Sequence, residues 1–110
     1  MSVPISPIQL PPCGDCAADA QWLEQALLTW LNNEYLPEAV NTAIAQRAAQ
    51  VYRRQRLEGE HELGGILLAL VTELQEFDFS QSFYSEFAVA NAVSDLLLRR
   101  LGLDPCCGAG

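Results

Sequence analysis

The chain has 110 residues, the length of one ordinary domain, and half of them are hydrophobic, so it can form a core. Fourteen acidic residues stand against six basic ones, all of them arginine, and the net charge is −8. This charge argues against nucleic acid and against anionic membranes as partners. The apolar runs are too short to cross a bilayer. We therefore expect a soluble, cytoplasmic protein.

The first fourteen residues are rich in proline and contain neither a basic region nor an unbroken apolar stretch. They therefore lack the features of a secretory signal peptide. Proline-rich segments of this kind favour an extended and poorly ordered chain. We expect a flexible leader over residues 1–14, a helical domain over 15–102 and a flexible, cysteine-containing tail over 103–110.

Apolar residues between the two ends recur every three or four positions, which is the period of an α-helix. The first helix is predicted to begin after Asp15, a good N-cap residue, and to reach about Asn32. The second is predicted to open at Pro37 and to stop at Gly59, because proline suits a first turn and glycine a C-terminal end.

The third helix is predicted from Leu63 to about Phe77, and the fourth from a serine cap, Ser80 or Ser82, to about Leu101, where Gly102 stops it. The apolar stripe of the fourth helix is expected to contain Phe83, Phe87, Ala90, Val93, Leu97 and Leu101. The residues expected to be most deeply buried are Leu27, Ile44, Leu67, Leu70, Val93 and Leu97.

No segment alternates with the period of two that marks a strand, so the predicted fold class is all-α. Short connections favour antiparallel neighbours, and a four-helix up-down-up-down bundle is then the simplest arrangement. In such a bundle, the start of the first helix and the ends of the second and fourth meet at one pole. This pole would hold the cysteines and an arginine group, and the opposite pole would hold most of the aromatic residues.

Four cysteines lie in two pairs at the ends of the chain, Cys13 with Cys16 and Cys106 with Cys107. A secreted disulfide scaffold spreads its cysteines along the chain, so this pattern favours redox or metal-binding thiols. The first pair lies at a predicted helix start, where the helix dipole stabilises a thiolate. This turn resembles the active-site turn of thioredoxin-like proteins over four residues, but the chain lacks their alternating strands and helices.

Three states of these sulfurs are open. The four cysteines can together bind zinc or an iron–sulfur cluster. Oxidation can join the two pairs, or Cys13 with Cys16, before it closes the strained ring between Cys106 and Cys107. In the third state the thiols have no role.

No catalytic constellation is visible, since the chain has one histidine and no glycine-rich phosphate loop, so an enzyme is the less favoured interpretation. The leading hypothesis is a small protein-interaction module, an adaptor, assembly factor or regulator, tuned by redox or metal binding at its terminal cysteines. The alternative is a thiol–disulfide oxidoreductase or metal carrier that uses Cys13 and Cys16. The expected partner is another protein or, in a homodimer, a second copy. The candidate contact residues are Tyr35, Phe79, Tyr84, Arg53, Arg54, Arg99 and Arg100.

Overall fold

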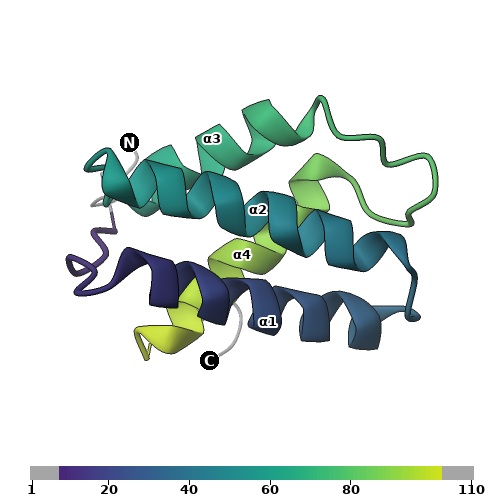
Figure 1. Cartoon of the computed structure of the whole chain (residues 1–110), viewed down its shortest axis with the longest axis horizontal. Coiled ribbons are helices and arrows are strands. Elements are labelled where there is room, and N and C mark those ends of the chain that lie inside the picture. Colours follow the sequence, from purple (N-terminus) through teal and green to yellow (C-terminus); the bar gives the residue numbers. More distant parts are fainter. Residues whose placement is uncertain (1–7, 103–110) are drawn as a thin grey trace, which may run out of the picture.

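A computed structural model describes residues 8–102 of the chain. Within this range there are four helices and no strand: α1 (Cys16–Glu34), α2 (Val40–Leu57), α3 (Leu63–Leu74) and α4 (Glu86–Arg100). The predicted all-α class is therefore confirmed. Helices α1 and α3 each pack against both α2 and α4. Figure 1 shows α1 and α2 side by side, with α4 crossing behind them at an oblique angle.

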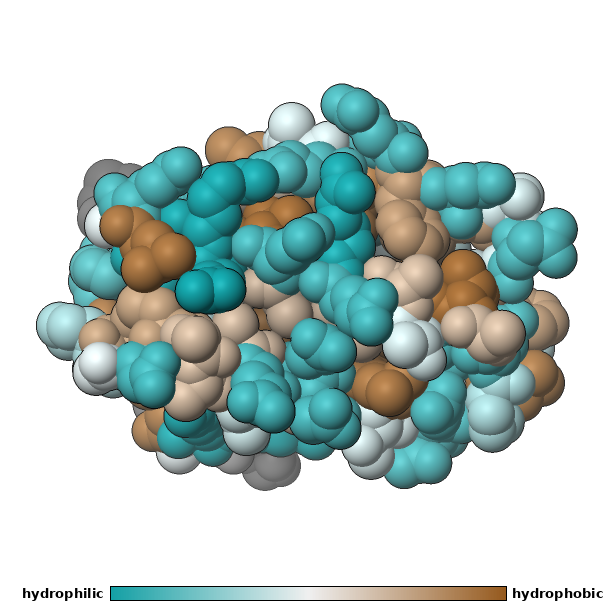
Figure 2. Space-filling view, in the orientation of Figure 1, coloured by the Kyte–Doolittle hydropathy of each residue, from teal (hydrophilic) through white to brown (hydrophobic). Residues whose placement is uncertain are grey.

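The up-down-up-down bundle stays a prediction, because the oblique course of α4 in Figure 1 departs from the near-parallel packing of such bundles. No helix within residues 8–102 is long and apolar enough to span a membrane. Figure 2 shows hydrophilic side chains over much of the face formed by α1 and α2, with hydrophobic residues in separate patches. The predicted tail, residues 103–110, lies outside the described residues, and so do residues 1–7 of the leader.

Part of the expected flexible leader is packed against the helices. The Leu10 N–H donates to the His61 carbonyl at 2.7 Å, and the Leu63 N–H donates to the Ile8 carbonyl at 2.8 Å. These bonds form an isolated antiparallel bridge between Gln9 and the residue that precedes α3. The Leu10 side chain is buried in the core. Two apolar residues on alternate positions therefore hold residues 8–10 in place, although prolines surround them.

Four predicted helix ends agree with the structure, and one of them is the start of α3 at Leu63. The Asp15 side chain caps α1, and Gly59 and Gly102, which follow α2 and α4, have φ angles of +93° and +80°. Glycine adopts this left-handed conformation without the steric penalty that a side chain brings. The predicted cap of α4 was wrong: Ser85 accepts from the Ala88 N–H, and neither Ser80 nor Ser82 caps the helix.

Two further boundaries differ from the prediction by three residues each. Helix α2 begins at Val40 rather than Pro37, and α3 ends at Leu74 rather than Phe77. Phe77 lies in the turn after α3, where its N–H donates to the Leu74 carbonyl. Helix ends fray into turns of this kind, so their apolar residues still contact the core.

The core contains five of the six residues predicted to be most deeply buried, and Leu67 is the exception. The buried face of α3 is formed instead by Leu63, Ile66, Leu70 and Leu74. The stripe predicted for α4 was also wrong at Phe83 and Phe87, each 60% exposed. Phe83 precedes the helix, and Phe87 lies two residues, or about 200° of rotation, before the buried Val89.

Candidate functional site

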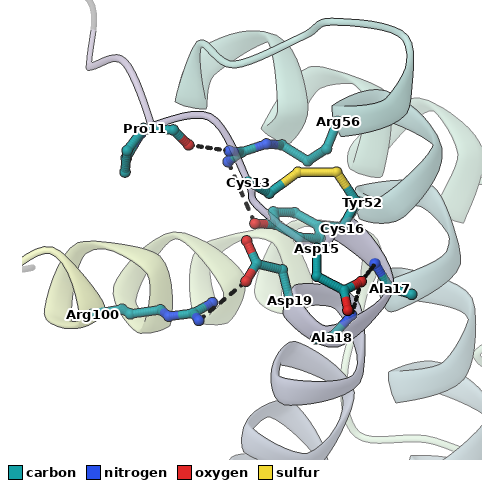
Figure 3. The surroundings of a disulfide bond; sticks show 10 residues. All are labelled: Pro11, Cys13, Asp15, Cys16, Ala17, Ala18, Asp19, Tyr52, Arg56 and Arg100. Carbon is teal, nitrogen blue, oxygen red and sulfur yellow. Dashed lines mark hydrogen bonds and ion pairs between the residues drawn. A yellow bond between two sulfur atoms is a disulfide. The ribbon is translucent and has the colours of Figure 1, made fainter.

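Cys13 and Cys16 are joined by a disulfide at the start of α1. Figure 3 shows this bond lying across the beginning of the helix, beside the side chain of Arg56. The two Cα atoms are 5.3 Å apart, within the usual range for disulfide-linked residues. This bond is one of the two oxidised pairings considered from the sequence. Cys106 and Cys107 lie outside the described residues, so a role for the second pair stays a prediction.

The local sequence between the two cysteines explains the turn. Asp15 is extended, and its Oδ1 accepts hydrogen bonds from the N–H groups of Ala17 and Ala18, each at 3.1 Å. These two bonds satisfy N–H groups that have no partner within the helix. Cys16 thus becomes the first residue of α1, and Cys13 lies one turn outside it. Within residues 8–102, no group of three or more His, Cys, Asp or Glu side chains is placed to hold a metal ion.

The Arg56 side chain, in the last turn of α2, is buried at this pole with an exposed fraction of 4%. One guanidinium nitrogen donates to the Pro11 carbonyl, and another to the Tyr52 hydroxyl at 3.4 Å. Figure 3 shows the guanidinium reaching between these two residues. Its charge also lies over the Tyr52 ring, 5.7 Å from the centroid. Arg56 therefore ties the leader to α2.

Arg100, in the last turn of α4, connects that helix to α1. Its Nη2 lies 3.2 Å from Asp19 Oδ1, and its guanidinium lies over the Trp22 ring at 4.2 Å from the centroid. The two charges also complement the helix dipoles. Asp19 is an acid in the first turn of α1, and Arg100 is a base in the last turn of α4. The end of α4 consequently lies beside the beginning of α1, as Figure 3 shows.

A cavity of about 220 Å³ lies where the leader, α1, α2 and α4 meet. We call it the leader pocket; its walls are residues 10–14, Asp19, Tyr52, Arg56, Leu97, Arg100 and Leu101. Burial raises the pKa of the Tyr52 hydroxyl, against the opposing charge of Arg56. The pocket therefore combines apolar walls with a neutral hydroxyl and two guanidinium groups.

The other arginines predicted to gather with the cysteines do not line the leader pocket. Arg54 pairs with Glu73 of α3, so it joins α2 to α3. Arg53 borders a shallow depression between α1 and α2, and Arg99 is exposed at the end of α4. Arg56, which was not among the candidate contact residues, makes the hydrogen bonds to Pro11 and Tyr52 at this pole.

The predicted aromatic residues form three separate pairs. The Tyr35 and Phe83 rings lie against each other at a tilt of 35°, with centroids 4.3 Å apart, and their side chains are 61% and 60% exposed. Phe79 is half-buried against Phe77, with centroids 4.9 Å apart. Leu36, next to Tyr35, is also exposed. We call Tyr35, Leu36 and Phe83 the aromatic patch.

Tyr84 was expected to contact a partner, but it is buried and serves the fold. Its hydroxyl donates to the Leu31 carbonyl at 2.7 Å, and its ring lies 5.9 Å from that of Trp30. Burial raises the pKa of Tyr84, and the negative charges of Glu34 and Glu38 raise it further. Tyr84 thereby fixes the segment before α4 against the end of α1.

Sequence reasoning missed both the docked leader and the buried arginine. The alternation of Ile8 and Leu10 was a signal for the first, because it matches the period of a strand. Arg56 carried no such signal, since arginine in a last helical turn normally faces water and complements the dipole. Its burial depends on the leader, which folds over it from a position 45 residues earlier in the chain.

The region of the chain that matches a known family covers all four helices. Residues 7–101 match the model of a domain of unknown function, DUF8822, and the chain therefore belongs to this family. No curated protein and no solved structure shows a significant match.

Proposed function

We propose that this domain is a cytoplasmic, up-down-up-down helical module that binds another protein, as an adaptor, assembly factor or regulator does. The observation that supports it is the aromatic patch, in which two paired rings and Leu36 remain exposed. Aromatic side chains are typical anchors of protein interfaces. Neither ring is needed to fill the core, so its exposure calls for a covering surface.

Charge near the patch favours a basic partner over a second copy of the chain. Glu34 and Glu38 lie close enough to Tyr84 to raise its pKa. The buried Oε1 of Glu38 has no hydrogen-bond partner within the described residues. Two copies of a chain with a net charge of −8 repel each other, whereas a partner with lysine or arginine around an apolar pocket would complement this rim.

The Cys13–Cys16 disulfide supports redox tuning of the module. The bond ties the docked leader to the first residue of α1, while Arg56 and the bridge at Gln9 hold the same segment from α2 and α3. Reduction removes one of these three attachments, so it changes the mobility of the leader without dissolving the core. Binding of a partner near this pole would then respond to the redox state.

The patch is tested by affinity capture from the native host with three forms of the full chain. The forms are the wild type, a Tyr35→Ala/Phe83→Ala variant and a Leu68→Ala control, and mass spectrometry identifies the captured proteins. Leu68 is 68% exposed on α3 and lies outside the patch. A partner should be retained by the wild type and the control and lost by the double variant, because an aromatic anchor contributes on the order of 2 kcal/mol or more.

The captured partner is then purified and its affinity measured at two salt concentrations. A basic partner should bind more weakly at the higher concentration. Equal retention by the wild type and the double variant would contradict the proposed contact surface. Circular dichroism of the variants checks that the loss is not caused by unfolding.

A second candidate function, thiol–disulfide exchange, is favoured by the position of the disulfide. Cys16 is the first residue of α1, and Cys13 lines the leader pocket, so a substrate sulfur has space to approach. A thiolate at this helix terminus would be stabilised by the dipole. The test is reduction of a model protein disulfide by the reduced chain, compared with Cys13→Ser and Cys16→Ser variants. Only loss of activity in the variants would support this role over that of an adaptor.

A metal carrier that uses Cys13 and Cys16 is the remaining version of this alternative, with Cys106 and Cys107 as the further ligands for zinc or an iron–sulfur cluster. Four thiolates are a sufficient ligand set for either group. The observation that supports it is limited to the first pair, which lies at one exposed turn. The test is the melting temperature of the reduced chain during a zinc titration. A metal carrier should melt at a higher temperature as zinc is added, whereas a chain that only forms the disulfide should not change.

A further inference from the structure

Arg56 is a buried charge without an acidic partner among residues 8–102. A guanidinium remains protonated at any pH at which proteins fold, so it cannot escape burial by losing its charge. The one acid that lines the leader pocket, Asp19, already pairs with Arg100. The charged walls of the pocket thus carry two positive charges and one negative charge, in a chain that is strongly acidic as a whole.

The hydrogen-bond donors of the pocket are only partly used. A guanidinium has five N–H groups, and Arg56 uses two of them, toward Pro11 and Tyr52. Its Nε is buried and has no acceptor in the described part of the chain. The Tyr52 hydroxyl accepts from Arg56, and its own proton has no acceptor within the same residues. A guanidinium with N–H groups to spare can bind an anionic oxygen through charge-assisted hydrogen bonds.

The size and the walls of the pocket restrict what the anion can be. Leu10, Leu97 and Leu101 provide apolar surface, and the volume of about 220 Å³ is below that of most drug-sized ligand sites. A dianion such as phosphate would meet the carboxylate of Asp19 and would leave the leucine surface without contact. A single negative charge on a small apolar group fits both the donors and the leucines.

We propose that the leader pocket binds a small monocarboxylate, with the carboxylate at Arg56 and Tyr52 and its apolar group against the three leucines. This site goes beyond the protein-interaction function proposed above, because it lies at the opposite end of α1 from the aromatic patch. Either proposal can fail without the other. A free short-chain acid and the carboxyl terminus of an apolar peptide share this chemistry, and the experiment distinguishes them.

Isothermal titration calorimetry of the full chain with hexanoate tests the site, and hexanamide serves as the matched neutral probe. We expect hexanoate to bind at least about tenfold more tightly than hexanamide, because a charge-assisted hydrogen bond is stronger than a neutral one. Inorganic phosphate should bind more weakly than hexanoate. Equal binding of acid and amide, tighter binding of phosphate, or no binding of hexanoate would overturn the proposal.

Two variants locate the site. Arg56→Gln should weaken hexanoate binding by about tenfold or more, whereas Arg53→Gln, an exposed arginine outside the pocket, should leave it unchanged. Asp19→Asn, which removes the one negative charge of the pocket, should tighten binding, and it keeps the measurement informative if Arg56→Gln does not fold. Unchanged affinity in both Arg56→Gln and Asp19→Asn would place the bound acid elsewhere and overturn the proposal.

A short acetylated peptide that ends in leucine separates the two sources of the carboxylate. Displacement of hexanoate by this peptide, but not by its C-terminal amide, would support the site and assign it to protein carboxyl termini. Binding of hexanoate without displacement would support the site and assign it to free acids. The Tyr35→Ala/Phe83→Ala variant should bind hexanoate as the wild type does, which keeps the two proposals distinguishable.

Discussion

The Tyr84 hydroxyl connects two segments that are 53 residues apart, because it donates to the Leu31 carbonyl near the end of α1. Leu31 is among the last four residues of that helix, and its carbonyl therefore has no partner within the helix. A buried carbonyl of this kind needs a donor from elsewhere. At the scale of a single residue, Tyr84 is thus a structural tyrosine, although it lies between the exposed Phe83 and the cap of α4.

Tyr84→Phe should lower the free energy of unfolding by about 1–3 kcal/mol, because it leaves the Leu31 carbonyl buried without a donor. The measurement is urea denaturation followed by circular dichroism. Tyr35→Phe is the matched control, since its side chain is 61% exposed, and this change should have little effect. Equal stability of the two variants would mean that the Tyr84 hydroxyl is hydrated rather than bonded to Leu31.

At the scale of elements, α3 shows how helical geometry selects one of several leucines. Residues 63–74 contain apolar side chains at most positions, and those at 66–71 are consecutive, so the sequence alone leaves several faces available for burial. Leu63, Ile66, Leu70 and Leu74 follow spacings of three, four and four, and they form the buried face. Leu67 lies beside this face and is half-buried, whereas Leu68 points to solvent.

Leu70→Ala should cost on the order of 2–5 kcal/mol of stability, because Leu70 is fully buried and its loss leaves a cavity. Leu68→Ala, two residues earlier on the same helix, should change stability by less than about 0.5 kcal/mol. Thermal and urea unfolding of both variants provide the comparison. A similar loss in the two variants would show that α3 is rotated from the described orientation.

The whole molecule is held together mainly by its core and by three attachments of the leader. The core extends over all four helices and includes Leu10 from the leader. The disulfide closes a ring of only a few residues, so it restricts the unfolded chain far less than a bridge between distant segments does. No metal is needed to account for the packing of the described residues.

Reduction of the full chain in the presence of a chelator should therefore leave the helices folded. The chain-entropy model gives a loss of at most about 2 kcal/mol for a ring of this size. We expect a small decrease in the melting temperature and an unchanged far-ultraviolet circular dichroism spectrum at room temperature. The Cys13→Ser/Cys16→Ser variant should match the reduced wild type. Collapse of the helical signal in chelator alone would instead assign a structural metal to the cysteines.

The sequence by itself determined the helices, about half of their ends and most of the buried residues. These features depend on local periodicity and on single residues such as Asp15 and Gly59, whose conformational preferences act wherever the chain goes. The same reasoning placed the four cysteines in two pairs and identified the first pair as a helix start. It also named Tyr35, which is exposed, as a candidate contact residue.

Only the tertiary structure decided which polar side chains are buried at each end of the molecule. Arg56 is buried because Leu10 and Pro11 fold back over the end of α2, and Tyr84 is buried because Leu31 needs a donor. Both outcomes depend on groups that lie 45 and 53 residues away in the chain. Periodicity describes neighbours within one helix, whereas burial of a polar group depends on which distant atom can satisfy it.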